Sequence, residues 1–356
     1  MGIEKIDKNF IIQKGNADGK AVYEIPHHKF GLHGVFYEET QGCFARVPFE
    51  IAQRVNEGVA ELTRHTSGGR ICFSTDSQIM QITARYKNLW IMSHMPLTGS
   101  GSFTLCEVEG EQEKFIGNFM PISTDKQGFT ATLNLKGGTL RNYVLYFPLY
   151  NDVQALSVAL DENARVEKYD PYRDIKPILY YGSSITQGGC ANRTDGAYQA
   201  LICKRNRVDF INLGFSGSAK GEDVMTDYLA SIDCSLFVCD YDHNAPNAAH
   251  LQATHFRLYE RYRKQRPDVP ILFITKPDWQ RDAEGDIRHQ IIKNTYLQAK
   301  KLGDKKVYFL SGKVFYGKKD AAEYAVDGCH PTDRGFHRMA EVIYKKIRRI
   351  YEDNKI

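Results

Sequence analysis

The sequence lacks an excess of charge of one sign. Of its 356 residues, 47 are basic and 43 are acidic, so the formal net charge is only +4. A protein that binds nucleic acid usually carries a clustered basic face. The densest basic run, residues 345–349, falls in a helical pattern that is typical of a solvated helix face. We therefore expect no nucleic-acid partner.

Long apolar runs are also absent. No run approaches the roughly 18–20 residues that a membrane-spanning helix needs. The first residues, Met-Gly-Ile-Glu-Lys, do not have the form of a secretory signal peptide. We expect a cytoplasmic protein with no membrane partner, although a leader removed from the chain would leave no trace.

Paired cysteine spacing is missing as well. None of the eight cysteines belongs to a C-x-x-C pair, and several lie inside apolar runs, as Cys239 does. Small buried thiols in a reducing compartment account for such cysteines. Zinc sites usually show paired spacing of Cys and His, so we expect no metal.

Glycine motifs for nucleotide binding are not found either. A Gly-Gly pair stands at residues 188–189, but neither a G-x-G-x-x-G pattern nor a P-loop lysine accompanies it. The pair is therefore not favoured as a phosphate cradle, and we expect no organic cofactor.

The pattern of predicted secondary structure changes near the middle of the chain. With 42% hydrophobic residues and this length, the composition favours packed cores and two domains. Residues 20–160 form short runs of β-formers separated by Gly, Asn and Ser clusters, a pattern typical of an all-β sandwich or jelly roll. One helical stretch, residues 50–63, interrupts the β-formers. The charged segment 161–176 is the best linker, which gives domains 1–170 and 171–356.

The second half alternates apolar runs of strand length with helical patterns. The runs lie at 177–181, 208–213, 236–241, 269–275 and 306–310, and the helical patterns at 198–205, 222–230, 248–265, 287–302 and 333–351. This alternation predicts right-handed βαβ units and a parallel sheet covered on both faces, an α/β fold. Ligands bind beyond the carboxyl ends of such strands.

The segments that follow the predicted strands hold the residues for acyl transfer. The first strand leads into Gly-Ser-Ser-Ile-Thr (182–186), the second into a glycine-containing loop and the third into a loop with an asparagine. Near the C-terminus, Asp327 precedes His330 by three residues, a spacing that can hold the imidazole as an oriented general base. A hydroxyl, a backbone N–H and an amide from the three loops would complete a serine hydrolase site.

These segments resemble the conserved blocks of the SGNH (GDSL-like) hydrolase superfamily, and they occur along the chain in the same order as in that superfamily. The phrases Gly-Ser-Ser-Ile-Thr-Gln-Gly, Asn-Leu-Gly-Phe-Ser-Gly and Asp-Gly-Cys-His-Pro are similar to a bacterial branch in which a β-sandwich precedes the hydrolase domain. Residues 102–106 correspond to the branch's Gly-x-Asp-Leu-Tyr signature but match it only poorly. The resemblance implies a three-layer, flavodoxin-like parallel sheet preceded by a sandwich or jelly-roll domain.

The resemblance also implies roles for single residues. Ser184 would be the nucleophile, His330 the general base and Asp327 its orienting carboxylate. The N–H groups of Ser184 and Gly217, with the Asn244 side chain, would form the oxyanion hole. In this sequence a serine, Ser183, stands where the family usually has an aspartate, but that aspartate is not the triad carboxylate.

Three further residues near these segments have open roles. Asp242 stands close to the expected oxyanion, so we expect its carboxylate to be paired or turned away. His243 is a rival base, although a paired surface histidine is the favoured interpretation. Trp279 follows the fourth predicted strand. It can line a sugar-binding face or serve ordinary packing, and neither role is favoured.

The function expected from this resemblance is an esterase that removes small acyl groups, most often acetyl, from a carbohydrate or related polyol. Its partner would be a small-molecule or oligosaccharide ester. A lipid or thioester acylhydrolase is an alternative, but the sequence shows no Leu/Phe-rich lid insertion. A catalytically inactive carbohydrate-binding protein is another. The sequence does not predict the oligomeric state.

Overall fold

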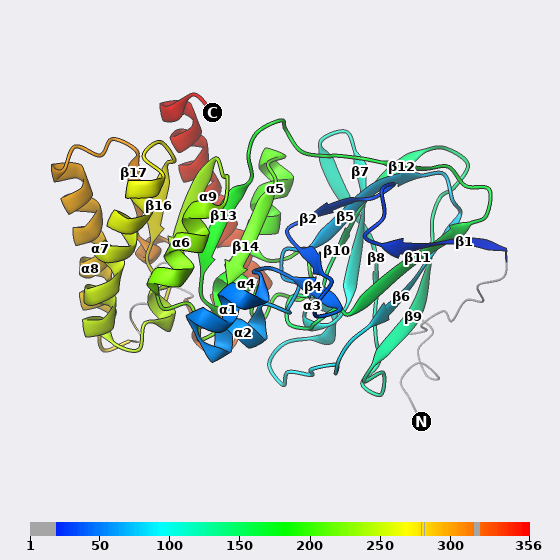
Figure 1. The fold of residues 1–356 in the computed structure, drawn as a ribbon, viewed down its shortest axis with the longest axis horizontal. Helices are drawn as coiled ribbons and strands as arrows, with labels where there is room; N and C mark the ends of the chain where they lie inside the picture. Colours follow the sequence, from blue (N-terminus) through cyan, green and yellow to red (C-terminus); the bar gives the residue numbers. More distant parts are fainter. Residues whose placement is uncertain (1–18, 279, 281, 317–320) are drawn as a thin grey trace.

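The structure is a computed structural model that describes residues 19–278, 280, 282–316 and 321–356. In Figure 1 the β-rich N-terminal part lies beside the α/β C-terminal part. The N-terminal part contains two antiparallel sheets. The first has the strand order β1 (Lys20–Ile25), β11 (Ala155–Asp161), β6 (Ile79–Arg85) and β9 (Gly128–Asn134).

The second antiparallel sheet is larger. Its strand order is β12 (Val166–Lys168), β5 (Arg70–Thr75), β10 (Arg141–Tyr146), β7 (Phe103–Glu109) and β8 (Gln112–Phe119), with β2 (Gly31–His33) also paired to β5. Side chains of both sheets share one buried core, for example Ile82 and Val158 from the first sheet with Phe73 and Leu145 from the second. The expected sandwich is therefore confirmed. A short hairpin joins β3 (Phe36–Glu38) to β4 (Cys43–Ala45).

The helical stretch expected at 50–63 is two helices, α1 (Phe49–Val55) and α2 (Glu57–Leu62). Asn56 separates them because its backbone is extended and its side chain accepts a hydrogen bond from the Val59 N–H, which caps α2. Along the chain these helices lie between β4 and β5, as expected. They pack on the C-terminal part, and Ala52, Val59 and Leu62 belong to its core. A third short helix, α3 (Leu97–Ser100), precedes β7.

The C-terminal part is built on a parallel sheet with the order β14-β13-β15-β16-β17. Numbered along the chain this order is 2-1-3-4-5, which is flavodoxin-like, as expected. The direction of the order reverses beside β13, so the loop that follows β13 lies at the switch point. The strands are β13 (Ile178–Gly182), β14 (Phe210–Gly214), β15 (Leu236–Asp240), β16 (Ile271–Ile274) and β17 (Val307–Leu310).

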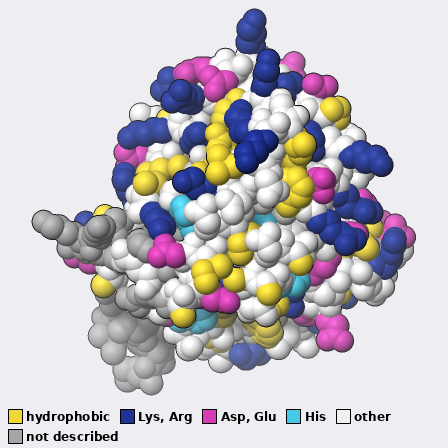
Figure 2. All heavy atoms as spheres, turned by 90° about the vertical axis from the view of Figure 1, so that its left-hand side faces the viewer, with side chains coloured by type: hydrophobic (Ala, Val, Ile, Leu, Met, Phe, Trp, Pro, Cys, Tyr) yellow, Lys and Arg dark blue, Asp and Glu magenta, His cyan; other side chains and the backbone are white. Residues whose placement is uncertain are grey.

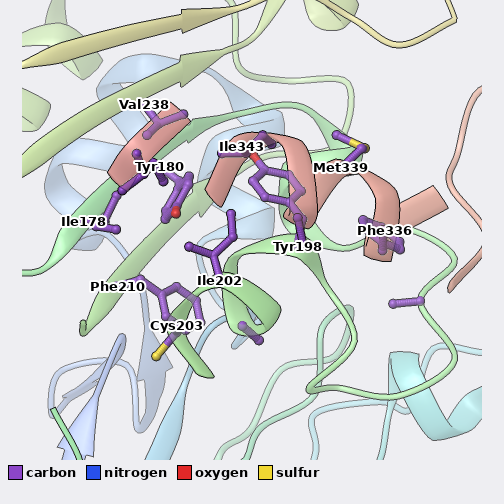
Figure 3. Packing of buried hydrophobic residues seen from close by; sticks show 14 of the residues in the cluster. Ile178, Tyr180, Tyr198, Ile202, Cys203, Phe210, Val238, Phe336, Met339 and Ile343 are labelled. Atoms are coloured by element: carbon purple, nitrogen blue, oxygen red, sulfur yellow. The ribbon is translucent and has the colours of Figure 1, made fainter. Parts of the chain in front are cut away.

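Helices cover both faces of the sheet. Ile178 and Tyr180 of β13 face the layer formed by α5 (Tyr198–Asn206) and α9 (Asp333–Asn354), where Figure 3 shows them with Ile202 and Ile343. The alternate residues Leu179 and Tyr181 face α6 (Asp223–Ser231), α7 (Ala248–Gln265) and α8 (Gly285–Lys301). This two-sided burial explains why the strands are continuous apolar runs.

The predicted helices and strands of this part are confirmed, with ends that differ by a few residues. Shorter elements lie in the loops: α4 (Ser184–Gln187), η3 (Asp242–Asn244), η5 (Gly312–Val314) and η6 (Ala321–Tyr324). The helical stripe on α9 is also confirmed, because its apolar side chains Phe336, Met339, Ala340, Ile343 and Ile347 are fully buried.

Two buried arginines connect the N-terminal part to the parallel sheet. The Arg70 guanidinium is ion-paired with Asp209, just before β14, and donates to the Tyr172 hydroxyl at 2.5 Å. The Arg46 guanidinium donates to the carbonyl oxygens of Asn212 and Gly214, at 3.1 and 2.6 Å. Burial lowers the pKa of Arg46 to about 9. Both arginines fix the end strand of the sheet against the sandwich.

Three observations concern the cysteines, the surface charges and the helices of the described residues. All eight cysteines are free, and seven of them are buried. Figure 2 shows basic and acidic side chains intermingled on the face that carries α7 and α8. Among the described helices, none has the length and apolar character needed to cross a membrane.

Candidate active site

The loop after β13 places Ser184 at the first turn of α4. Gly182 is required at the end of the strand, because a Cβ there would collide with Thr186 and with the Asp240 carbonyl. The Ser183 hydroxyl then accepts a hydrogen bond from the Ile185 N–H at 3.2 Å and caps the helix. The substitution of serine for the family's aspartate at position 183 therefore keeps a capping side chain. Ser184 itself is 9% exposed.

His330 lies beside Ser184 although 146 residues separate them in the chain. The His330 Nε2 and Ser184 Oγ atoms are 2.8 Å apart. On the other side of the ring, Nδ1 is 2.7 Å from Oδ2 of Asp327. A carboxylate only accepts hydrogen bonds, so the Nδ1 atom carries the proton and the Nε2 lone pair faces the serine hydroxyl.

The Asp327 carboxylate is itself held in place by the backbone. Its Oδ1 atom accepts hydrogen bonds from the N–H groups of Cys329 and His330, at 2.9 and 2.8 Å. Partial burial raises the pKa of Asp327, but the hydrogen bonds from the His330 side chain and from these N–H groups outweigh burial and hold the pKa well below its usual value. Asp327 is therefore ionised at neutral pH.

The residues expected to form the oxyanion hole lie in three neighbouring loops. Within the described residues, neither the Ser184 N–H nor the Gly217 N–H has a hydrogen-bond acceptor. Gly217 has a φ of +65°, a left-handed conformation that favours glycine. The Asn244 side chain donates from Nδ2 to the Phe215 carbonyl at 2.6 Å, and one of its two N–H groups stays available.

The loop after β15 carries buried carboxyl groups. The Oδ2 atom of Asp242 accepts a hydrogen bond from the Lys276 N–H at 2.9 Å, while its buried Oδ1 atom has no partner among the described residues. Burial raises the pKa of Asp240, the carboxyl at the end of β15, to about 8, and the nearby Asp242 adds to this effect. Asp240 is hydrogen-bonded to the Thr186 hydroxyl beneath the nucleophile loop.

His243 is paired, as expected, but it is not the surface residue that was expected. Its Nε2 atom lies 2.8 Å from Oδ1 of Asp278, and its side chain is only 11% exposed, so it is not a surface residue. Burial lowers the pKa of His243, but Asp278 and Cys329 raise it well above its usual value. The partner is Asp278 and not the neighbouring Asp242, which sequence spacing does not reveal. A charged, paired imidazole is no rival base.

Side chains of the N-terminal part support the nucleophile loop, and the sequence analysis did not identify them. The Tyr150 hydroxyl donates to the Ser184 carbonyl at 3.1 Å. The Gln187 amide donates to the Leu149 carbonyl at 3.1 Å and accepts from the Ser216 N–H at 3.0 Å. Gln187 therefore links the sandwich, the nucleophile loop and the loop that carries Gly217.

The α1–α2 pair holds the loop after β14 in the same way. The Asn56 side chain donates to the Ser218 carbonyl at 2.9 Å and to Glu222 at 2.6 Å. Gly58 packs so closely that a Cβ on it would collide with the Ser218 hydroxyl. The position of Gly217 therefore depends on residues that precede it by about 160 positions.

Two groups of side chains have the donor atoms and the spacing for a metal ion among the described residues. One is His94, Cys190 and His330, and the other is His243, Asp278 and Cys329. The ring of His94, which comes from the sandwich, lies 5.7 Å from the His330 ring. Burial raises the pKa of the Cys190 thiol to about 12, so the thiol is neutral. Trp279 lies outside the described residues.

Two family models match nearly all of the chain. The model of the GDSL-like lipase/acylhydrolase family matches residues 175–348. The model of the N-terminus of Esterase_SGNH_hydro-type matches residues 23–166. The comparison with curated proteins found no match.

Solved structures share the two-part fold over most of the chain. A protein from Bacteroides ovatus described as a GDSL-like lipase is 24% identical, with a TM-score of 0.84 over 93% of this chain and 98% of its own. The salicylyl-acyltransferase SsfX3 of a tetracycline biosynthetic pathway is 17% identical, with a TM-score of 0.77 over 94% and 98%. A family two carbohydrate esterase from Clostridium thermocellum, in complex with cellohexaose, is 15% identical, with a TM-score of 0.59 over 80% and 92%. At these identities the likeness establishes the fold.

Proposed function

Because the chain belongs to the GDSL-like lipase/acylhydrolase family of the SGNH hydrolase superfamily, we propose that it is a serine esterase that removes short acyl groups, above all acetyl, from a carbohydrate or related polyol. Acyl ester hydrolysis follows from the family. What we propose in addition is which residues are catalytic and which class of substrate is hydrolysed. The observation that carries it is the continuous chain of hydrogen bonds from Ser184 through His330 to Asp327, at 2.8 and 2.7 Å.

The first half of the reaction forms an acyl-enzyme. The Ser184 oxygen attacks the ester carbonyl while His330 Nε2 takes the hydroxyl proton. The resulting oxyanion accepts hydrogen bonds from the Ser184 and Gly217 N–H groups and from the Asn244 amide. The C–O bond to the alcohol then breaks, and His330 returns the proton to the leaving alkoxide. The ionised Asp327 stabilises the imidazolium throughout.

The second half restores the enzyme with water. His330 removes a proton from a water molecule, which attacks the acyl-serine carbonyl, and the same donors stabilise the second oxyanion. Collapse releases the carboxylic acid and returns the proton to Ser184. No redox or metal step is required in this sequence of bond changes.

The choice of a carbohydrate ester has separate support. The carbohydrate esterase crystallised with cellohexaose has the same combination of a β-rich part and a parallel sheet. In this chain, sandwich residues contact the nucleophile loop directly, as Tyr150 does. A lipid acylhydrolase would need a long apolar channel, and the loops next to Ser184 and Gly217 hold buried polar side chains instead, such as Gln187 and Asn212.

A screen of acetylated oligosaccharides with the wild type and Ser184→Ala tests the proposal. We expect acetate release by the wild type and a loss of at least about 10⁴-fold in the variant. Faster turnover of p-nitrophenyl octanoate than of the acetate would instead favour the lipid alternative. A fluorophosphonate probe that fails to label Ser184 would favour the inactive binding protein.

A further inference from the structure

We propose that a zinc ion binds His94, Cys190 and His330, and that it reversibly switches off the esterase by occupying the imidazole nitrogen that faces Ser184. The inhibition rests on the proposed function, whereas the binding site does not. The three ligands come from the sandwich, from the loop after α4 and from the loop before α9. No sequence spacing connects them.

The first support is the chemistry and spacing of the donors. Imidazole nitrogen and thiolate sulfur are the ligands that Zn²⁺ prefers, and three protein ligands with a water are a common set. The neutral Cys190 thiol releases its proton when the ion binds. One donor atom from each residue lies within 4.8 Å of the others. A tetrahedral zinc site needs ligand atoms about 3.3–3.8 Å apart. The 4.8 Å limit is wider than this range, and the exposed His94 side chain has room to reorient toward the ion.

The second support is that the two additional ligands make no competing hydrogen bond within the part of the chain that the structure describes. Among the described residues, neither the His94 imidazole nor the Cys190 thiol has a hydrogen-bond partner. Cys190 also has a φ of +74°, in the left-handed region that non-glycine residues rarely adopt. The next residue is fixed, because the Ala191 carbonyl packs directly on Gly99 of α3. The backbone next to the thiol is thus fixed between the sandwich and the catalytic loop.

The third support is the orientation of His330. Histidines that bind zinc usually donate their other N–H to a carboxylate, which fixes the ring and increases the basicity of the free nitrogen. Asp327 makes this contact with Nδ1 at 2.7 Å. The same hydrogen bond that prepares Nε2 to accept a proton therefore prepares it to bind a metal ion. A zinc ion on Nε2 removes the base from Ser184.

In the second group of possible ligands the histidine is held by a carboxylate, whereas Nε2 of His330 faces a neutral serine hydroxyl. His243 is already ion-paired with Asp278 at 2.8 Å, and the Cys329 thiol lies 3.9 Å from the other nitrogen of the same ring. Metal binding there would have to break an existing buried pair. Cys329 is therefore a matched control for Cys190. Cys329 immediately precedes His330 in the chain, and Cys190 lies near the His330 ring in space.

Binding is tested first without reference to catalysis. Co²⁺ is titrated into the full-length protein, and the thiolate-to-cobalt absorption and the d–d bands of a tetrahedral site are recorded, followed by displacement with Zn²⁺. We expect both signals in the wild type and in Cys329→Ser. The thiolate band should be lost in Cys190→Gly, a variant that keeps the left-handed backbone without strain.

Inhibition is tested with the same proteins and p-nitrophenyl acetate. Zn²⁺ should inhibit the wild type, and a chelator should restore activity. His94→Ala and Cys190→Gly should retain basal activity but need much more Zn²⁺ for half inhibition. The increase should exceed the roughly 10–100-fold that loss of an outer hydrogen-bond partner of a metal ligand costs.

The outcomes separate the two proposals. If the cobalt signal depends on Cys190 and no esterase activity exists, the proposed function is wrong and the metal site stands. If activity is normal but Zn²⁺ sensitivity is the same in wild type and Cys190→Gly, the metal site is wrong. Loss of Zn²⁺ sensitivity in Cys329→Ser but not in Cys190→Gly would also overturn it, because it would assign the metal to the other group.

Discussion

At the scale of single residues, the proposed chemistry depends on the tautomer of one imidazole. Asp327 is three residues before His330 and accepts from its Nδ1 atom, so this part of the site is local and was predictable from the sequence. The pair His243–Asp278 is 35 positions apart, and it was not predictable because no local geometry brings the two together. Spacing along the chain therefore predicts contacts only between residues that are close in the sequence.

Replacement of Asp327 by asparagine tests the role of the tautomer. The new side chain would present an amide to Nδ1 and would favour the proton on the wrong nitrogen, so kcat should fall about 10²–10⁴-fold with little change in KM. The measurement is steady-state hydrolysis of p-nitrophenyl acetate. Asp333→Asn, at the start of α9, is the control. A kcat within twofold of the wild type would contradict the assignment of Asp327.

The buried Asp240 predicts a dependence of stability on pH. Its folded pKa is raised to about 8 by burial, whereas the unfolded group titrates near 3.8. The folded state therefore holds a proton that the unfolded state releases, so the stability from this group is complete below about pH 4 and is lost as the pH rises through 8. The substitution Asp240→Asn removes the titrating carboxyl group, so the variant should not lose stability in this way as the pH rises.

We expect the melting temperature of Asp240→Asn, relative to that of the wild type, to rise by a few degrees between pH 5 and pH 9. Differential scanning fluorimetry between these pH values measures the gap. A gap that does not change with pH would show that Asp240 is ionised in the folded protein throughout this range.

At the scale of helices and strands, periodic patterns predicted the elements of the parallel sheet well, because their apolar residues face two cores. The division of α1 from α2 was missed. Asn56 was the available signal, since asparagine before Glu57 is a typical helix N-cap. What no pattern revealed is that these helices pack on the loop that carries Gly217.

Gly58→Ala tests this packing. The new Cβ would lie 2.8 Å from the Ser218 Cβ and would displace the loop, so kcat should fall about 10–100-fold. Alanine favours a helix over glycine, so the melting temperature should change little. Ser218→Gly in the same protein should restore most of the activity.

The exposed neighbour Glu61→Ala on the same helix is the control, and it should leave kcat unchanged. If Gly58→Ala has wild-type kcat, or if Ser218→Gly fails to rescue it, the α2 contact does not position the oxyanion loop.

At the scale of the whole molecule, the sequence predicted two parts but not how they dock. Arg70 and Asp209 are 139 positions apart, and a single sequence carries no signal that pairs them. Because α1 and α2 precede most of the sandwich but join the core of the C-terminal part, the division at residue 170 stays a proposal. The docked sandwich supplies contacts that support the site, and the site is therefore a property of both parts.

Loss of the Arg70–Asp209 pair should weaken this docking. Arg70→Met leaves the partly buried Asp209 carboxylate with His33 and the Phe210 N–H as its hydrogen-bond partners, and breaking such a pair costs about 3–5 kcal/mol. Urea denaturation followed by tryptophan fluorescence should show an earlier first transition. The double variant Arg70→Met/Asp209→Asn removes both charges and should recover part of the loss. Equal stability of the single and double variants would contradict a buried charge pair.

The most direct measurement is the mass of the enzyme during turnover. The protein is mixed with p-nitrophenyl acetate, quenched in acid within milliseconds and digested, and the peptides are analysed by mass spectrometry. We predict one acetyl group on the peptide that contains Ser184, absent in Ser184→Ala and formed far more slowly in His330→Ala. An acetyl group on another residue, or equal acetylation of Ser184 with and without His330, would contradict the account.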